Sequence, residues 1–214
     1  MSIFRVRDYL SVLLYRIAAG LFGSFGRRVR VVWPMRLVGL KNMHLGDDVT
    51  IANMAYIAAL REFDEEPRLS LGNGTRLGEF AHVVCTHSVT IGRDVLVANR
   101  VFISDCDHAY RDISISVLRQ GLDKGRPVSI GDDSWIGENV CIVSASIGRH
   151  CVIGANSVVT RDVPDYSVVA GAPARIVRRY CADRQSWLPT DIDGAFRNND
   201  QVDAPATAQS SVQG

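Results

Sequence analysis

Residues 130–159 read IGDDSWIGENVCIVSASIGRHCVIGANSVV, and an isoleucine or valine opens each block of six, with one block shortened to five. An α-helix repeats near 3.6 residues and a simple strand near 2, so neither fits this period. Three short strands that turn in a coil do fit it, because the aliphatic side chain of each strand can point into a shared core. The opening positions are Ile130, Ile136, Ile142, Ile147, Ile153 and Val159.

The same period runs through the residues upstream, so the repeat covers most of the chain. Each of the fifteen opening positions is Leu, Ile or Val. Stacked coils bury one continuous core, in which each coil rests on its neighbours. The sequence therefore predicts an all-β fold, a parallel β-helix of about five full coils over residues 31–172. The upstream positions are Leu45, Ile51, Ile57, Leu71, Leu77, Val83, Ile91, Val97 and Ile103.

Three insertions interrupt the repeat, at about residues 63–70, 89–90 and 109–129. Each follows the third block of a coil, so we expect all three loops to leave the coil from one edge. Loops carried by a repeating scaffold commonly form its binding site. The long loop 109–129 is the strongest candidate for such a site.

The two flanks lack the period of six. Residues 1–30 are predicted to form a helical cap, because residues 3–22 carry a helical apolar stripe. That helix either covers the open end of the coil or, with six arginines and one aspartate in residues 1–30, lies on a membrane surface. Residues 173–197 are predicted to form a short C-terminal helix that starts near Pro173. Residues 198–214 have the composition of a disordered tail.

Composition excludes several classes of protein. The 24 Lys and Arg against 23 Asp and Glu give no reason to expect a nucleic-acid partner. Five cysteines are scattered without a CxxC pair, which indicates reduced thiols in the cytoplasm and no structural metal site. The N-terminal stretch is a poor signal peptide, because Arg16 interrupts its apolar run.

Two segments carry a family resemblance: PVSIGDDSWIGENV (127–140) and SIGRHCVIGANSVVTRDVPDYSVVAGAPAR (146–175). They resemble the last coils of the hexapeptide-repeat sugar O-acetyltransferases, and the resemblance covers about residues 31–180. SDCDHAYRD (104–112) with the following QG is most similar to the polysaccharide-modifying branch. The resemblance implies a left-handed coil, a homotrimer, acetyl-CoA as co-substrate and a sugar or glycan acceptor used in cell-surface polysaccharide or O-antigen synthesis. It also implies a cytoplasmic enzyme, which could work at the inner face of the membrane.

His108, at the start of the long loop, matches the place of the catalytic histidine in that family. Transfer of an acetyl group to a hydroxyl needs a base, and unperturbed imidazole titrates near pH 6.5. A carboxylate can orient such a ring, and of Asp105 and Asp107 we favour Asp105. Cys106 invites a covalent mechanism, although its position inside a block also suits packing.

The donor and acceptor sites are predicted from the resemblance. Residues that match pantetheine and phosphate contacts of CoA in the family, together with an aromatic residue beside its cleft, are Ala155, Thr160, Arg161, Arg175, Arg178 and Trp135. His87 and His82 could line the acceptor cleft or pack. Asn99 is a neighbour of the expected acceptor-binding asparagine by stacking, not a match.

Two other activities compete with this interpretation. N-acetylation of an amino sugar nucleotide uses the same fold, but no GxGxxG motif lies in the first 40 residues. A γ-class carbonic anhydrase binds zinc through three histidines, and His82, His87 and His44 have a similar spacing. The registers of His82 and His87 differ, so we expect no bound metal.

Overall fold

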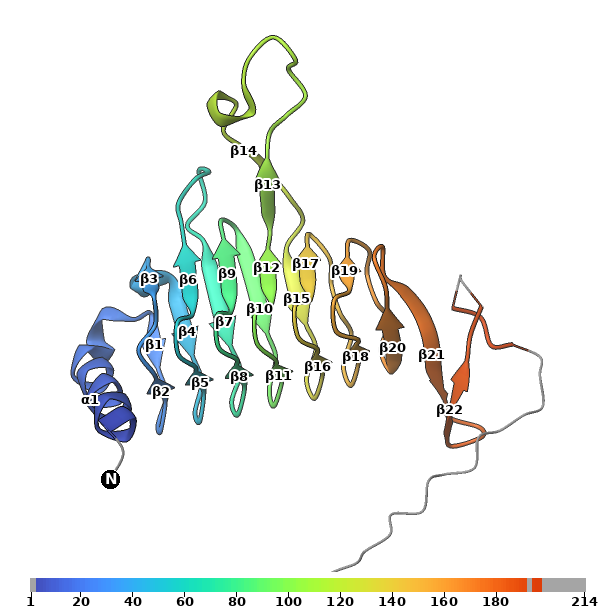
Figure 1. Ribbon diagram of the computed structural model, residues 1–214, viewed down its shortest axis with the longest axis horizontal. Coiled ribbons are helices and arrows are strands. Elements are labelled where there is room, and N and C mark those ends of the chain that lie inside the picture. Colours follow the sequence, from blue (N-terminus) through green and yellow to red (C-terminus); the bar gives the residue numbers. More distant parts are fainter. Residues whose placement is uncertain (1–2, 192–193, 198–214) are drawn as a thin grey trace, which may run out of the picture.

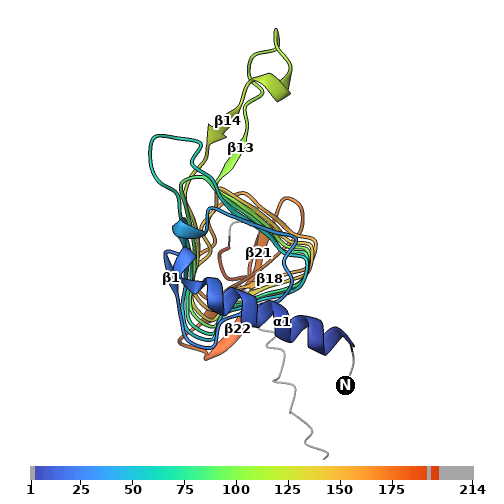
Figure 2. The same cartoon turned by 90° about the vertical axis from the view of Figure 1, so that its left-hand side faces the viewer.

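The computed structural model describes residues 3–191 and 194–197, so the predicted tail 198–214 lies outside the described residues. Three parallel sheets wind into a prism with a roughly triangular outline along its axis (Figures 1 and 2). The first sheet holds β1 (Ser24–Phe25), β4 (Met43–Leu45), β7 (Arg68–Leu71), β10 (Ser88–Ile91) and β15 (Val128–Ile130). The second holds β2 (Arg30–Val31), β5 (Thr50–Ile51), β8 (Arg76–Leu77), β11 (Leu96–Val97), β16 (Trp135–Ile136), β18 (Val152–Ile153) and β20 (Ser167–Ala170). The third holds β3 (Arg36–Val38), β6 (Tyr56–Ala59), β9 (His82–Cys85), β12 (Phe102–Ser104), β17 (Cys141–Val143) and β19 (Val158–Val159).

The core lies along the axis of the prism and is built from the aliphatic positions of the repeat. All fifteen of them are buried. They stack in register, as Ile51 pairs with Leu77 and Ile136 pairs with Ile153. Removal of these side chains from water is the main force that holds one coil on the next.

The coil starts earlier than residue 31 and contains one more full turn than predicted. Residues 24–38 form a first coil, whose inward residues Phe25, Val31 and Leu37 pair with Leu45, Ile51 and Ile57. An aromatic residue at the first position and a step of eight residues to the next coil, through a 3₁₀ turn at Leu40–Asn42, conceal this coil in the sequence.

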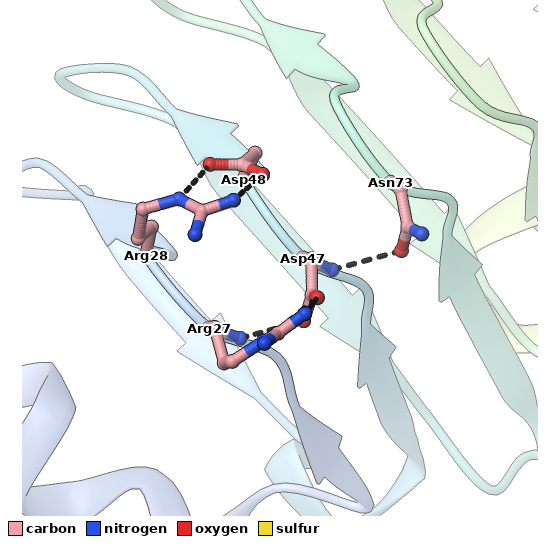
Figure 3. Close-up of polar contacts among 5 residues, drawn as sticks. All are labelled: Arg27, Arg28, Asp47, Asp48 and Asn73. Carbon is pink, nitrogen blue, oxygen red and sulfur yellow. Dashed lines mark hydrogen bonds and ion pairs between the residues drawn. The ribbon is translucent and has the colours of Figure 1, made fainter.

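The corners between the first and second sheets are built alike in successive coils. Gly72 lies where a Cβ would come within 2.5 Å of the backbone of Gly92 in the next coil, which explains the glycine after the aliphatic residue. Asp47 accepts a hydrogen bond from the backbone N–H of Arg27 (2.8 Å), and Asn73 accepts one from that of Asp47 (2.9 Å). Figure 3 shows this ladder with the ion pair between Arg28 and Asp48.

The N-terminal cap consists of α1 (Ile3–Ile17) and a 3₁₀ turn at Ala18–Leu21, which confirms the predicted helix. The helix lies across the first coil (Figure 2). Buried Ser11 donates a hydrogen bond to the carbonyl oxygen of Val31 (3.0 Å) and accepts one from the N–H of Trp33 (2.7 Å). Among the described residues, no helix is long and apolar enough to cross a membrane.

The predicted C-terminal helix at 173–197 is wrong, because residues there form strands. β21 (Arg175–Cys181) and β22 (Ser186–Pro189) extend the second sheet beyond β20 as an antiparallel hairpin. After the last coil, β20 would present unpaired backbone groups at the edge of the sheet, and the returning chain satisfies them. The local sequence of residues 173–197 does not show that β20 needs a partner strand, so it could not predict this pairing.

Three excursions leave the coil between the third and first sheets, along the upper edge in Figure 1. They span residues 60–67, 86–87 and 105–127. The third one begins as a hairpin, in which β13 (Cys106–His108) pairs with β14 (Leu122–Lys124), and a 3₁₀ turn at Val117–Arg119 lies near its tip. The spacing of the sequence predicted this common edge.

Candidate active site

His108 lies on the stem of the hairpin, where β13 continues the direction of β12 away from the coil. Its side chain is exposed and its residue pairs with Leu122 of β14. The backbone N–H of His108 donates to Asp107 Oδ1 (2.8 Å), while its imidazole has no hydrogen-bond partner in the part of the chain that the structure describes. An unengaged imidazole on a rigid stem is able to exchange a proton with a bound molecule.

Asp105 has a different task from the one that the sequence suggested. Its carboxylate is fully buried, and Oδ1 accepts hydrogen bonds from the backbone N–H of Thr86 (2.7 Å) and from its hydroxyl (3.0 Å). Oδ2 accepts from the N–H groups of His87 (2.8 Å) and Ser88 (2.6 Å). Both oxygens are thus engaged by residues 86–88, so Asp105 builds the corner beneath the hairpin instead of orienting the ring of His108.

The return of the hairpin is fixed at the same corner. Gly125 donates its N–H to the carbonyl oxygen of Asp105 (3.0 Å). A Cβ at this position would come within 2.0 Å of Ser144 Oγ and 2.7 Å of that carbonyl oxygen. Only glycine permits this close approach, and no repeat pattern in the sequence indicated it.

His87 belongs to a polar cluster that joins the three excursions. Its Nδ1 lies 2.8 Å from Glu65 Oε2, and Lys124 Nζ on β14 lies 3.2 Å from the same oxygen. The hydrogen bond from Lys124 is the main reason why the pKa of Glu65 is lowered. The sequence did not identify Glu65 and Lys124, because 59 residues separate them and only the fold brings them together. His87 is therefore at the base of the stem that carries His108.

His82 and Asn99 lie elsewhere. The ring of His82 is on the outer surface of the third sheet, edge-on between Tyr56 (4.7 Å) and Phe102 (5.1 Å), and burial lowers its pKa. Asn99 lies at the corner between the second and third sheets, where its Oδ1 accepts the N–H of Glu79 (2.9 Å). This corner is not the one that carries His108, so the structure does not bring these candidate acceptor residues together.

Thiol and zinc chemistry find little support in the geometry. Cys106 is buried, and its Sγ lies 3.5 Å from Ser104 Oγ, so its thiol is not open to a bound substrate. His44 contacts Arg68 on the first sheet, whereas His82 and His87 have the separate partners given above. In the described residues, no cluster of three His, Cys, Asp or Glu side chains could hold a metal ion.

A cleft of about 310 Å³ opens near the last coils, at the small end of the range for ligand sites. It is lined by three of the predicted CoA residues, Thr160, Arg161 and Arg175. Arg161 is exposed and has no ion-pair partner among the residues described here. Asp162 also lines the cleft, but its carboxylate is paired with Arg126 (3.0 Å), so two guanidinium groups remain that suit a phosphate-bearing ligand.

The other predicted CoA residues lie outside this cleft. Ala155 is in an exposed turn between β18 and β19. Trp135, which is 51% exposed, and Arg178 lie on the second sheet, at β16 and β21. Arg175 and Arg178 share β21, and Trp135 lies on β16 of the same sheet, so three of the six residues belong to the second sheet and the other three to turns beside β19.

Comparisons with known proteins agree with the architecture. Residues 127–161 match a model described as the hexapeptide repeat of succinyl-transferase. The chain is 34% identical to a putative lipopolysaccharide biosynthesis O-acetyl transferase, WbbJ, of Escherichia coli K12, over 54% of this chain and 62% of that one. It is 37% identical to the probable acetyltransferase Rv3034c of Mycobacterium tuberculosis, over 64% and 42% of the two chains. The chain thus spans less than two thirds of the length of either relative.

The fold also has a close match among solved structures. AntD, an N-acyltransferase from Bacillus cereus in complex with dTDP and 3-hydroxybutyryl-CoA, superposes with a TM-score of 0.66. The match covers 80% of this chain and 90% of that chain at 14% sequence identity. At this identity the likeness supports the fold alone.

Proposed function

Because this chain belongs to the family of hexapeptide-repeat acetyltransferases, we propose that it moves an acetyl group from acetyl-CoA to a sugar hydroxyl. The acceptor is a sugar or glycan used in cell-surface polysaccharide or O-antigen synthesis, and the reaction takes place in the cytoplasm. The observation that carries this proposal is the free, exposed imidazole of His108 on the hairpin stem.

His108 acts as the general base in a direct transfer. Neutral imidazole takes the proton from the acceptor hydroxyl while the hydroxyl oxygen forms a bond to the thioester carbonyl carbon. The resulting tetrahedral intermediate expels the CoA thiolate as the carbon–sulfur bond breaks, and the imidazolium returns the proton to the sulfur. No acyl-enzyme is formed, in keeping with the burial of Cys106.

The donor site is proposed at the late coils. Arg161 and Arg175 bind phosphate groups of CoA beside Thr160, and Ala155 offers its backbone to the pantetheine arm. His108 is on the stem of the hairpin that follows β12, two strands of the third sheet away from β19, which leads to Thr160 and Arg161. We therefore propose a homotrimer of left-handed coils, in which His108 of one subunit meets the late coils of the next.

The acceptor site is proposed around the base of the hairpin. His87 is the candidate residue there, because its ring lies within the cluster of Glu65 and Lys124 that supports the stem. His82 and Asn99 lie on other surfaces of the same chain and take part only if a second subunit brings them to the site.

A thiol-release assay tests the proposal. Purified protein is incubated with acetyl-CoA and a panel of sugars, sugar nucleotides, amino sugar nucleotides and polysaccharide fragments. We expect release of CoA with a hydroxyl acceptor and its loss in a His108→Ala variant. Release with amino sugar nucleotides alone would instead indicate N-acetylation. Light scattering should give the mass of a trimer, and a monomer at micromolar concentration would contradict the shared site.

A further inference from the structure

The face of the N-terminal cap that points away from the coil is apolar and uncovered. Ser11 and Tyr15 of α1 contact the first coil and the residues next to it. The remaining apolar residues of the cap follow the spacing of a helical stripe on the other side. Their exposed fractions range from 39% to 76%, for Val6, Tyr9, Leu10, Leu13, Leu14, Ile17 and Leu21.

Among the described residues, unpaired arginines lie beside this apolar face. Residues 1–30 contain six arginines and one aspartate, whereas the rest of the chain has 18 basic and 22 acidic residues. Three of these arginines have acidic partners: Arg7 is paired with Asp8 (3.1 Å), Arg27 with Asp47 (2.8 Å) and Arg28 with Asp48. Arg16 and Arg30 form no ion pair within the described ranges, and both line a groove with Tyr9, Val12 and Asp8, whose carboxylate is paired with Arg7. The groove thus combines two free guanidinium groups with apolar surface.

We propose that α1 binds the protein to the surface of an anionic lipid bilayer. The apolar side chains enter the boundary between headgroups and acyl chains, and Arg16 and Arg30 contact headgroup phosphates. Charge complementarity favours a lipid over a second copy of the chain, because pairing two such helices would bring two arginine-rich surfaces together. This surface is separate from His108 and from the cleft at Arg175.

The position of α1 suits this contact. Figures 1 and 2 show the helix across the N-terminal end of the coil, with the rest of the coil stacked away from it. The helix can therefore lie flat on a bilayer without obstruction by the loops of the active-site edge. In the proposed trimer, parallel coils would present three such helices on one side, which would strengthen binding through multivalency.

Flotation of the full chain with vesicles tests the proposal. The vesicles contain phosphatidylcholine alone or phosphatidylcholine mixed with phosphatidylglycerol. We expect binding to the mixed vesicles to be at least about tenfold tighter, and to weaken as salt is added. Leu14→Glu and Arg16→Glu, at exposed positions that should not disturb folding, should each reduce binding by about tenfold or more.

A matched control is Leu118→Glu on the tip of the hairpin, where the side chain is 90% exposed. This variant should bind the mixed vesicles as the unchanged protein does. Equal binding to both types of vesicle, or no binding, would overturn the proposal. So would unchanged vesicle binding of Leu14→Glu combined with a smaller assembly, since the helix would then contact a second copy. Acetyl transfer to a soluble acceptor is measured separately, so failure here leaves the proposed activity intact.

Discussion

Two edges of the coil use the same polar contact in different ways. At the edge between the first and second sheets, Asp47, Asn73 and Asp132 each accept a backbone N–H from the preceding coil. The side chains of Asp47 and Asp132 are partly exposed (28% and 34%), and the contact recurs along the edge. At the edge between the third and first sheets, Asp105 alone gathers three backbone N–H groups and is fully buried.

The difference shows how one scaffold can have a regular edge and another edge that carries the hairpin with His108. The contact at Asp47, Asn73 and Asp132 fixes corners at which the described chain passes from the first sheet to the second without an insertion. A single buried carboxylate fixes one corner firmly, and the chain on either side of it is then free to extend as β13 and β14. The hairpin with His108 rises from the edge where the repeat is broken.

Replacement of His108 should give the largest difference between the two edges. His108→Ala is expected to lower turnover by about 10² to 10⁴, the usual contribution of a general base. The affinity for acetyl-CoA should change little, because the proposed phosphate contacts lie elsewhere. Steady-state kinetics of CoA release measures both. Asn99→Ala, at a corner without an insertion, is the control and should keep turnover within about twofold if this corner serves structure alone.

Replacement of Asp105 should separate folding from catalysis. Asp105→Ala leaves the N–H groups of Thr86, His87 and Ser88 without their acceptor, and we expect a loss of about 3 kcal/mol in the free energy of unfolding. Urea denaturation measures it. Asp132→Ala at the regular edge should cost less, because this carboxylate is partly exposed and water can reach the N–H group that it leaves, whereas Asp105 is fully buried. Equal losses at the two sites would remove the distinction between the edges.

Replacement of Arg175 should affect the donor alone. Arg175→Ala is expected to raise KM for acetyl-CoA by about tenfold, since a charge-assisted contact to phosphate binds ground and transition states alike. Turnover should stay near that of the unchanged protein. Arg184→Ala, in the exposed turn between β21 and β22, serves as the control. A defect confined to turnover would place Arg175 beside the reacting carbon.

The smallest expected effect is that of low pH on the stability of the edge between the first and second sheets. Hydrogen bonds from the backbone N–H and the side chain of Arg27 lower the pKa of Asp47 below 3.8, and a hydrogen bond from Arg28 lowers that of Asp48. A lowered pKa in the folded state adds stability above pH 3.8, which is lost as the pH falls through the lower value. Asp47→Asn should therefore reduce the difference in stability between pH 7 and pH 3, as measured by urea denaturation. An unchanged difference would mean that the ladder at Asp47 is not sensitive to charge.

The sequence predicted the features of the fold that follow from the repeated aliphatic positions of the core. The fifteen aliphatic positions gave the coil, and the insertions gave the edge that carries His108. The sequence does not reveal the first coil, because an aromatic residue, Phe25, holds its first inward position. In addition, a step of eight residues instead of six leads from Leu37 to Leu45 of the next coil. The strands at 175–189 differ from the helix that the sequence predicts at 173–197, because their pairing is imposed by β20 and not by local preference.

The site was predictable only in part, for a physical reason. Position in the repeat indicates which edge a residue occupies, and this located His108. Position in the repeat does not indicate which backbone N–H groups need an acceptor. The N–H groups of residues 86–88 do, and Asp105 accepts their hydrogen bonds. The contact between Glu65 and Lys124 likewise joins two loops whose paths the repeat does not determine.

The number of stacked coils also determines how far the hairpin with His108 lies from the N-terminal end of the coil. β12, which leads to His108, is the fourth strand of the third sheet counted from β3. With about 4.8 Å between neighbouring strands, the hairpin leaves the coil roughly 14 Å above the first turn, and hence above the end on which α1 lies. Because each coil rests only on its neighbours, insertion or removal of one whole coil below β12 would shift His108 by one such step. The number of coils below the hairpin thus sets the distance between His108 and α1, which in the proposed function would be the distance that a membrane-bound acceptor has to extend.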